Sequence, residues 1–277
     1  MTDYLNDSYD LNNPDIVSAL DEAPIWSAPF GLKLLQYIDY KPNINVLDIG
    51  AGTGFPLTEV AMRLGKSCTV TGIDPWEAAL DRIRFKVGQY SISNLNLIKG
   101  VAEEMPFEDE SFDLITSTNG INNVQDLKKV LDECYRVATM NAQILFTVNL
   151  KRTMKEFYDV FRTVLHSLGK DNAVKQMKHH IHEKRMPLVE LTEMIQDAGF
   201  DITQLIKDEF RYSFSDGSAM LNHYFIKLAF MPSWKEIAGT NAHEVFEKVE
   251  EQLNTTASEK GKLDLTIPMV LIEGRKQ

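Results

Sequence analysis

The 277-residue sequence has few of the features that mark a secreted, membrane-spanning or disulfide-stabilised protein. It has only two cysteines, Cys68 and Cys134, which we expect to be buried free thiols because an unpaired cysteine behaves as a small apolar residue. No apolar run reaches the roughly 18 residues of a membrane-spanning helix, and the polar, acidic start "MTDYLNDSYD" is unlike a signal peptide. We therefore expect a cytoplasmic protein with no membrane partner.

Positive charge is also scarce. The sequence has 29 lysines and arginines against 40 aspartates and glutamates, which gives a net charge of −11, and no run of basic residues stands out. Because nucleic-acid binding draws its affinity from clustered basic side chains, we expect no nucleic-acid partner. The hydrophobic content of 44% is ordinary for a globular protein and allows a sizeable core.

Between residues 44 and 150, short apolar segments alternate regularly with amphipathic ones. The apolar segments predict strands, and the amphipathic segments, with apolar residues three and four positions apart, predict helices. This alternation indicates right-handed crossovers and a parallel sheet that is covered on both faces. The predicted strands are residues 44–50, 68–74, 95–100, 112–117 and 143–150, and the predicted helices are residues 30–40, 57–64, 76–87 and 126–137.

After residue 150 the pattern is looser, with two more predicted strands among helical segments. Gly199 is expected to cap one of the helices, and Pro268 indicates that the last strand lies at an edge, carries a bulge or starts there. The simplest account is a single α/β domain with seven strands and with insertions before and after the sixth. The helical segments lie within residues 151–186, 187–200 and 213–260, and the strands at residues 200–210 and 265–275.

The first predicted strand leads into the glycine-rich stretch "VLDIGAGTGFP", for which three ligand classes compete. A phosphate-binding P-loop needs a lysine after its last glycine, and none follows Gly54. The dinucleotide fingerprint needs a third glycine or an alanine where Phe55 stands, which counts against NAD. The third class is S-adenosylmethionine, whose amino-acid end and ribose need bare backbone, as Gly50 and Gly52 after Asp48 would provide.

Asp74, at the end of the second predicted strand, is the next candidate for this ligand. A carboxylate at this place can accept hydrogen bonds from both ribose hydroxyls, although it can equally cap the helix that follows. Pro75 and Trp76 would then form a wall beside the adenine ring, while a place in the core is an equal alternative for Trp76.

Four segments together resemble a known family: "VLDIGAGTG", "GIDPWEAAL", "AEEMPFEDESFDLI" and "LDECYRV". The chain resembles the class I S-adenosylmethionine-dependent methyltransferases, and within them the small-molecule branch that includes the ubiquinone/menaquinone biosynthesis methyltransferases. The resemblance covers about residues 44–150. It implies a Rossmann-like, doubly wound, mostly parallel seven-stranded sheet with helical insertions that form a lid. The implied division is an N-terminal lid segment and helix at residues 1–43, a cofactor-binding core at 44–150, and the rest of the same domain at 151–277.

The resemblance also implies roles for individual residues. Gly50 and Gly52 would pass against the methionine moiety, and Asp48 would orient the loop or reach the amino group through water. Asp74 would hold the ribose diol, and Asn119, just past the fourth strand, would face the sulfonium or the methionine end.

The adenine contact departs from the family pattern. Ala102 would offer its backbone N–H to the ring, but Val101 stands where the family often has an acid that accepts from the adenine amino group. Glu103 or a water molecule would have to replace that acid. A tail motif of the quinone branch is not plainly present, so the motifs do not indicate a quinone acceptor.

Methyl transfer is an in-line displacement in which most of the rate comes from positioning the acceptor and the methyl group. A hydroxyl or carbon acceptor would also need a base, which no motif identifies. A metal is not expected, because His179 and His182 have helical spacing but no third ligand. Trp26 and Phe30 are candidates for the acceptor site, and the candidates for a base are His166, His179, His180, His182, His223 and Tyr224.

The sequence therefore predicts an S-adenosylmethionine-dependent methyltransferase that acts on a small-molecule metabolite and releases S-adenosylhomocysteine. The alternative is a protein that binds S-adenosylmethionine or S-adenosylhomocysteine without turnover. Two observations favour this alternative: Val101 departs from the family pattern, and no motif identifies a base.

Overall fold

A computed structural model describes residues 2–23 and 25–277. The chain divides into two compact units, which are described separately below. The core unit comprises Leu11–Asn149, Pro187–Asp208 and Met269–Gln277, and the helical unit comprises Met1–Asp10, Leu150–Met186 and Glu209–Pro268. The three-part division expected from the sequence stays a prediction.

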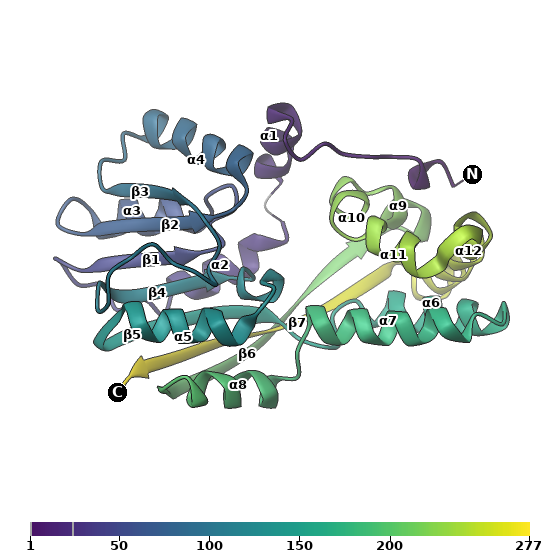
Figure 1. Ribbon diagram of the computed structural model, residues 1–277. Helices are drawn as coiled ribbons and strands as arrows, with labels where there is room; N and C mark the ends of the chain where they lie inside the picture. Colours follow the sequence, from purple (N-terminus) through teal and green to yellow (C-terminus); the bar gives the residue numbers. More distant parts are fainter. Residues whose placement is uncertain (1, 24) are drawn as a thin grey trace. The chain divides into compact units, whose positions relative to one another are not determined.

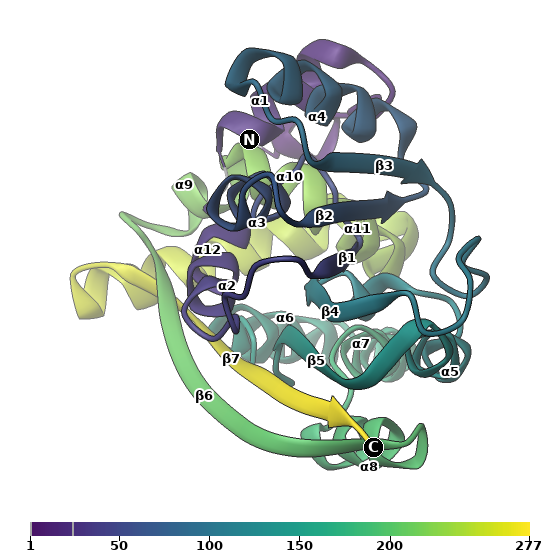
Figure 2. The ribbon, with the colours of Figure 1, turned by 90° about the vertical axis from the view of Figure 1, so that its left-hand side faces the viewer.

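One seven-stranded sheet has the order β3-β2-β1-β4-β5-β7-β6. Figures 1 and 2 both show the first five of these strands side by side in this order. All the pairings among those five are parallel, whereas β7 runs antiparallel to β5, so the expected mostly parallel sheet is confirmed. The strands are β1 (Asn45–Ile49), β2 (Thr69–Asp74), β3 (Leu95–Lys99), β4 (Phe112–Thr118), β5 (Ala138–Asn149), β6 (Phe200–Phe214) and β7 (Leu263–Lys276).

The strand order determines which face of the sheet each helix of the core unit covers. The chain moves from β1 outward to β2 and β3, then returns to β4 and moves outward to β5, so right-handed crossovers place α3 and α4 on one face and α5 on the other. Each helix buries one apolar stripe, as α5 does with Val130, Leu131, Cys134 and Val137. The helices are α1 (Pro14–Glu22), α2 (Ser27–Leu35), α3 (Leu57–Leu64), α4 (Glu77–Tyr90), α5 (Leu127–Val137) and α8 (Leu188–Asp197).

The helical unit packs around aromatic side chains. Phe157 stacks on the fully buried Trp234, with ring centroids 3.8 Å apart. None of the helices in the described part of the chain has the length and apolar character needed to cross a bilayer. The helices of this unit are α6 (Lys155–Ser167), α7 (Asp171–Lys184), α9 (Gly217–Asn222), α10 (Tyr224–Ala229), α11 (Met231–Ala238) and α12 (Ala242–Lys260), with short 3₁₀ turns at Asp3–Leu5 and Gly239–Asn241.

Most predicted elements are present, and both cysteines are buried and free, as expected. The helix expected at residues 30–40 is wrong at its end, because α2 stops at Leu35. There the Tyr40 hydroxyl donates to the Leu35 carbonyl at 2.9 Å, and the Gln143 side-chain amide donates to the Tyr37 carbonyl at 2.9 Å. These side chains take up carbonyls that a longer helix would use.

The last strand is longer than expected and lies inside the sheet, between β5 and β6. Its ladder with β5 begins at Met269, directly after Pro268. Pro268 lies within β7, so the expectation that it marks an edge of the sheet or the start of the strand is wrong. Because proline has no N–H to donate, its place just outside the ladder with β5 leaves that ladder intact.

Candidate functional site

The strand order reverses its direction between β1 and β4. The chain leaves these neighbouring strands toward opposite faces of the sheet, and ligands of open α/β sheets bind at the carboxyl ends of strands at such a point. The glycine loop follows β1, Asp74 ends β2, and Asn119 follows β4. The structure therefore brings the residues predicted for the methionine and ribose ends to one edge of the sheet.

The glycines of the loop differ in what surrounds their backbone. Gly50 and Gly52 have φ angles of 75° and 51°, in the left-handed region that favours glycine. A Cβ on Gly50 would lie 2.8 Å from the Cα of Gly120, so these two backbones pass in contact. A Cβ on Gly52 would meet nothing within 4 Å, so this backbone is open to a ligand. Gly120, after β4, was not among the residues predicted for the site.

Asp74 is buried and fastens the loop to the start of α4. Its Oδ2 accepts a hydrogen bond from the Gly52 N–H at 2.8 Å, and its Oδ1 accepts one from the Trp76 N–H at 2.8 Å. The N-cap residue of α4 is Trp76, so the interpretation of Asp74 as the helix cap is wrong, although Asp74 holds that residue in place. Each carboxylate oxygen of Asp74 retains a second lone pair for a ribose hydroxyl.

Asp48 is a second buried carboxylate, and its Oδ1 accepts a hydrogen bond from the Thr116 hydroxyl at 2.6 Å. Its pKa is raised to about 7, mainly by burial; the hydrogen bond from Thr116 opposes this rise, and the charge of Asp74 adds to it. Two neighbouring carboxyl groups favour a ligand with positive charge, such as one carrying an ammonium and a sulfonium.

Asn119, in the left-handed region with a φ of 56°, presents a hydrogen-bond donor. Its Oδ1 accepts from the backbone N–H of Asn149 at 3.2 Å and from Nδ2 of Asn122 at 3.2 Å. A backbone N–H can only donate, so this contact fixes which end of the amide is oxygen. The opposite atom, Nδ2, is buried without a partner among residues 2–23 and 25–277, which suits an oxygen of a ligand.

The segment after β3 holds the residues predicted for the adenine contact. Val101 is 46% exposed, while Ala102 is buried. The Glu103 carboxylate accepts from the backbone N–H groups of Gln125 and Asp126, at 2.7 and 3.3 Å. Glu103 is thus already engaged with the start of α5.

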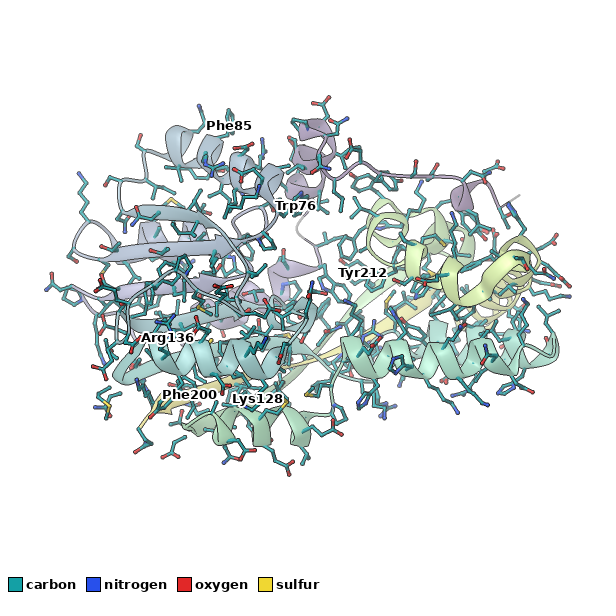
Figure 3. The ribbon with its side chains drawn as sticks, viewed as in Figure 1. Trp76, Phe85, Lys128, Arg136, Phe200 and Tyr212 are labelled. Carbon is teal, nitrogen blue, oxygen red and sulfur yellow. The ribbon has the colours of Figure 1, made fainter. Side chains whose placement is uncertain are left out.

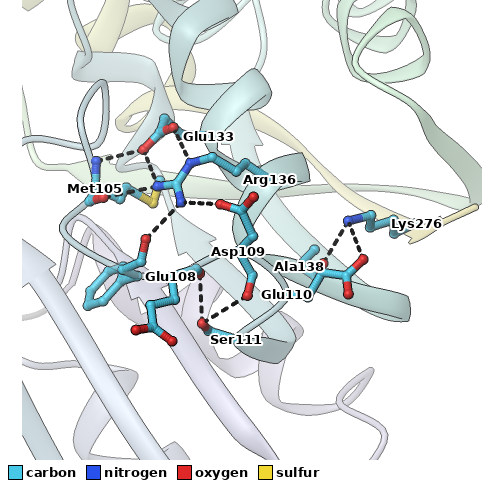
Figure 4. Close-up of polar contacts among 10 residues, drawn as sticks. Met105, Glu108, Asp109, Glu110, Ser111, Glu133, Arg136, Ala138 and Lys276 are labelled. Atoms are coloured by element: carbon cyan, nitrogen blue, oxygen red, sulfur yellow. Dashed lines mark hydrogen bonds and ion pairs between the residues drawn. The ribbon is translucent and has the colours of Figure 1, made fainter.

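Arg136, in the "LDECYRV" segment, holds this part of the chain against α5 (Figure 4). Its guanidinium donates to the carbonyls of Met105 and Phe107 at 3.0 and 2.7 Å and pairs with Glu133 and Asp109 at 2.6 and 2.8 Å. Because the planar guanidinium makes two parallel hydrogen bonds to the Glu133 carboxylate and others to the loop carbonyls, it fixes the loop against the helix. Sequence reasoning used the segment as a signature but did not identify this task.

The stretch before α2 is fastened to α4 at two points within the core unit. The Trp76 indole, half-buried and labelled in Figure 3, donates to the Leu11 carbonyl at 2.8 Å. Asp21 pairs with both Arg82 and Lys86 at 2.7 Å. Pro75 is exposed beside Trp76.

Phe30 and Trp26, the candidates for the acceptor site, do not have equivalent positions. Phe30 is fully buried in the core, so it does not line an open acceptor site in this structure. Trp26 is half-buried, and its ring centroid lies 6.0 Å from that of Phe30.

The candidate bases all lie in the helical unit. His166 and His179 are exposed beside Asp171 and Glu183, with the closest atoms 3.0 and 3.1 Å apart. His223 is half-buried, and burial lowers its pKa. These contacts assign none of the candidates as a base.

Comparison with known proteins identifies the family to which the chain belongs. Residues 47–146 match the family described as "Methyltransferase domain". A demethylmenaquinone methyltransferase of Listeria welshimeri is 34% identical over 191 residues, which cover 66% of this chain and 78% of that protein. A demethylmenaquinone methyltransferase of Bacillus cytotoxicus is 27% identical over 209 residues, which cover 73% of this chain and 86% of that protein.

Two solved structures share the fold. A putative methyltransferase of Bacillus halodurans aligns with a TM-score of 0.59 and 20% identity, covering 89% of this chain and 98% of that one. A methyltransferase of Aquifex aeolicus aligns with a TM-score of 0.54 and 20% identity, covering 72% of this chain and 93% of that one. Together with the sequence relatives and the glycine loop after β1, these likenesses show that the chain belongs to the S-adenosylmethionine-dependent methyltransferase family.

Proposed function

We propose that this methyltransferase acts on a small ring-bearing acceptor, with quinone-type rings as the first class to test. The relatives named demethylmenaquinone methyltransferases support this class, although no tail motif of the quinone branch was evident in the sequence. The same relatives favour catalysis over the alternative in which the cofactor is held without turnover. The observation that carries the cofactor assignment is the open Gly52 backbone beside the Asp74 carboxylate.

The proposed cofactor site uses the residues at the edge between β1 and β4. Gly50 and Gly52 lie against the methionine moiety, Asp48 faces its amino group, and Asp74 accepts from the ribose hydroxyls. Asn119 donates through Nδ2 to an oxygen of the same moiety. The support is the burial of both carboxylates and the unpartnered amide nitrogen.

The adenine ring is proposed to lie between two segments. Pro75 and Trp76 form one wall, and the backbone of Val101 and Ala102 offers the other. Because the Glu103 carboxylate is engaged with α5, water replaces the acid that Val101 lacks.

The bound cofactor supplies an electrophilic methyl group on a sulfonium. The chain's contribution is to fix that group in space: the glycine loop and Asp74 immobilise one side, and Asn119 the other. Holding the two reactants in line lowers the barrier without a covalent intermediate on the protein. The buried carboxylates favour binding of the positively charged cofactor, which is a contribution to affinity and not to the rate of transfer.

The experiment has two steps. Calorimetric titration with S-adenosylhomocysteine, with NADH as the control, tests the cofactor site. Transfer of a labelled methyl group from S-adenosylmethionine is then measured with a reduced naphthoquinone, a phenol and an alkyl amine. Transfer to the naphthoquinol alone supports the proposed class, and transfer to the amine alone contradicts it.

The remaining proposals concern partners and place. A net charge of −11 opposes association with polyanions, which supports an enzyme of small molecules that does not bind nucleic acid. We further propose that it works in the cytoplasm without a membrane partner. Fractionation of cells that produce the chain would contradict this if the protein sedimented with membranes.

A further inference from the structure

A surface pocket of about 790 Å³ lies entirely within the core unit. Helices α1, α2, α3 and α4 and the end of the glycine loop form its walls, and α1 lies beside α4 (Figure 2). None of the described residues that line it belongs to the proposed cofactor site. Its volume falls within the range of small-molecule sites, about 300–1,000 Å³.

Much of the wall of this pocket is apolar. Leu32 of α2, Met62 of α3 and Tyr90 at the end of α4 are 54%, 42% and 53% exposed. Leu35, which is buried, and Phe55, which is half-buried, continue the same surface. Exposed apolar side chains that gather around one hollow favour a ligand with an apolar body.

Two cations share one carboxylate in the same pocket. Oδ2 of Asp21 accepts from Nε of Arg82, and Oδ1 accepts from Nζ of Lys86, both at 2.7 Å. The side chains of Arg82 and Lys86 are only 22% and 9% exposed. Both cations retain N–H groups that Asp21 does not engage, since a guanidinium and an ammonium each have several donors. One positive charge is therefore left uncompensated at a place with little access to water.

The other charges of the pocket are closer to water. Glu59 and Arg63 pair with each other at 3.1 Å, and their side chains are 38% and 46% exposed. Glu22, the last residue of α1, is also exposed and adds a carboxylate to the lining. Water screens these exposed charges more than those of Arg82 and Lys86. The excess positive charge is thus local, and Glu22 disfavours a ligand with more than one negative charge.

The pocket adjoins the last glycine of the glycine loop. Thr58, which lines the pocket, donates through its hydroxyl to the carbonyl of Gly54 at 3.0 Å. A Cβ on Gly54 would lie 3.4 Å from Nζ of Lys86, whereas one on Gly52 would meet nothing within 4 Å. The pocket and the proposed cofactor site therefore share this loop but not their lining residues.

We propose that this pocket binds a small-molecule carboxylate with an apolar body, at a site separate from that of the cofactor. The carboxylate pairs with the free N–H groups of Arg82 and Lys86, and the apolar body covers Leu32 and Met62. One negative charge matches the one positive charge that Asp21 leaves over. Charge-assisted hydrogen bonds are stronger where water is partly excluded. Since this binding does not involve methyl transfer, the inference goes beyond the proposed function.

The test uses three probes that share one apolar chain and differ in charge. Decanoate, 1-decanol and decylamine are titrated calorimetrically into the full chain. We expect decanoate to bind about tenfold more tightly than 1-decanol, and decylamine to bind most weakly. Equal binding of all three probes would overturn the proposal, because the apolar wall alone would then hold them. Tightest binding of decylamine would also overturn it, because the carboxylates would then determine the choice of ligand.

Arg82→Gln tests where the carboxylate binds. Asp21 keeps Lys86 as its counter-charge in this variant, and the preference for decanoate over 1-decanol should fall from about tenfold to about twofold. Arg84→Gln is the matched control, because Arg84 is exposed on the same helix and is not among the lining residues. It should leave the preference unchanged. An unaltered preference in Arg82→Gln, or equal losses in both variants, would overturn the proposal.

Met62→Glu gives a second reading if Arg82→Gln does not fold. Met62 is partly exposed, so a glutamate can be accommodated at this position on α3. Its carboxylate in the apolar wall should weaken decanoate binding at least about tenfold, by repulsion and by lost apolar contact. An unaltered affinity for decanoate would place the ligand elsewhere and overturn the proposal.

Saturation with S-adenosylhomocysteine tests whether the two sites are separate. Decanoate should still bind to the saturated chain, and its displacement by S-adenosylhomocysteine would overturn the proposal. If S-adenosylhomocysteine binds but decanoate shows no preference over 1-decanol, this inference fails and the proposed cofactor site stands. If decanoate binds as expected but S-adenosylhomocysteine does not bind, the proposed function fails and this inference stands.

Discussion

The backbone N–H of Gly52 donates to Oδ2 of Asp74 at 2.8 Å, so one hydrogen bond joins the loop after β1 to the end of β2. Asp74→Ala removes this bond, the bond to Trp76 and the proposed ribose contacts. We expect the affinity for S-adenosylhomocysteine to fall at least about tenfold. Calorimetry checks this, with Asp81→Ala as the control because Asp81 is exposed and pairs with Arg84 on the surface. Equal losses in the two variants would contradict a specific role for Asp74.

Asp48 predicts a pH dependence of cofactor binding. Its pKa is about 7 in the folded chain, against an ordinary value of 3.8, so the free energy of unfolding attributable to it falls as the pH rises between these values. The ionised form pairs with the cofactor's amino group, so affinity should strengthen with pH up to about 7 and then level off, by as much as about tenfold per pH unit. Titrations between pH 5.5 and 8.5 test this. Asp48→Asn should flatten the profile, and an unaltered profile would assign the effect to another group.

The amide of Asn119 can be tested without changing its backbone conformation. Aspartate also tolerates the left-handed region, so Asn119→Asp keeps the loop but replaces the Nδ2 donor by an acceptor. We expect the KM for S-adenosylmethionine to rise about tenfold, with little change in the unfolding midpoint. Asn43→Asp is the control, because Asn43 is exposed and also has a φ in the left-handed region, of 62°. An unchanged KM in the Asn119 variant would show that the donor does not contact the cofactor.

The two loop glycines should respond differently to alanine. Gly52→Ala has open space for its Cβ and bears only the backbone strain, about 1–2 kcal/mol. Gly50→Ala adds a clash with Gly120 and should destabilise the chain by about 3 kcal/mol or more. Denaturant unfolding measures both. We also expect Gly52→Ala to weaken S-adenosylhomocysteine binding, because its methyl group projects into the proposed site.

The fold of the core unit could be predicted because local and long-range signals agree there. The apolar strands, the helix stripes and the stops at Gly65 and Gly199 all appear where the pattern places them. The end of α2 could not be predicted, since it depends on the side chain of Gln143, which is distant in sequence. Helix α1 has a local signal, Asn13 followed by Pro14, which a search for periodicity alone overlooks.

Residues of the candidate site could be predicted only where they belong to a contiguous sequence motif. Asp48 lies near the end of β1, Gly52 follows β1 and Asp74 ends β2, so their convergence follows from the topology. Asn149 contributes to the site through its backbone N–H, which no side-chain pattern reveals.

The contact between Gly50 and Gly120 ties together the loops that follow β1 and β4. Since bare backbones meet there, neither loop can shift without the other, whatever side chains surround them. The proposed place of the methionine moiety is therefore shaped here by the main chain and not by side chains.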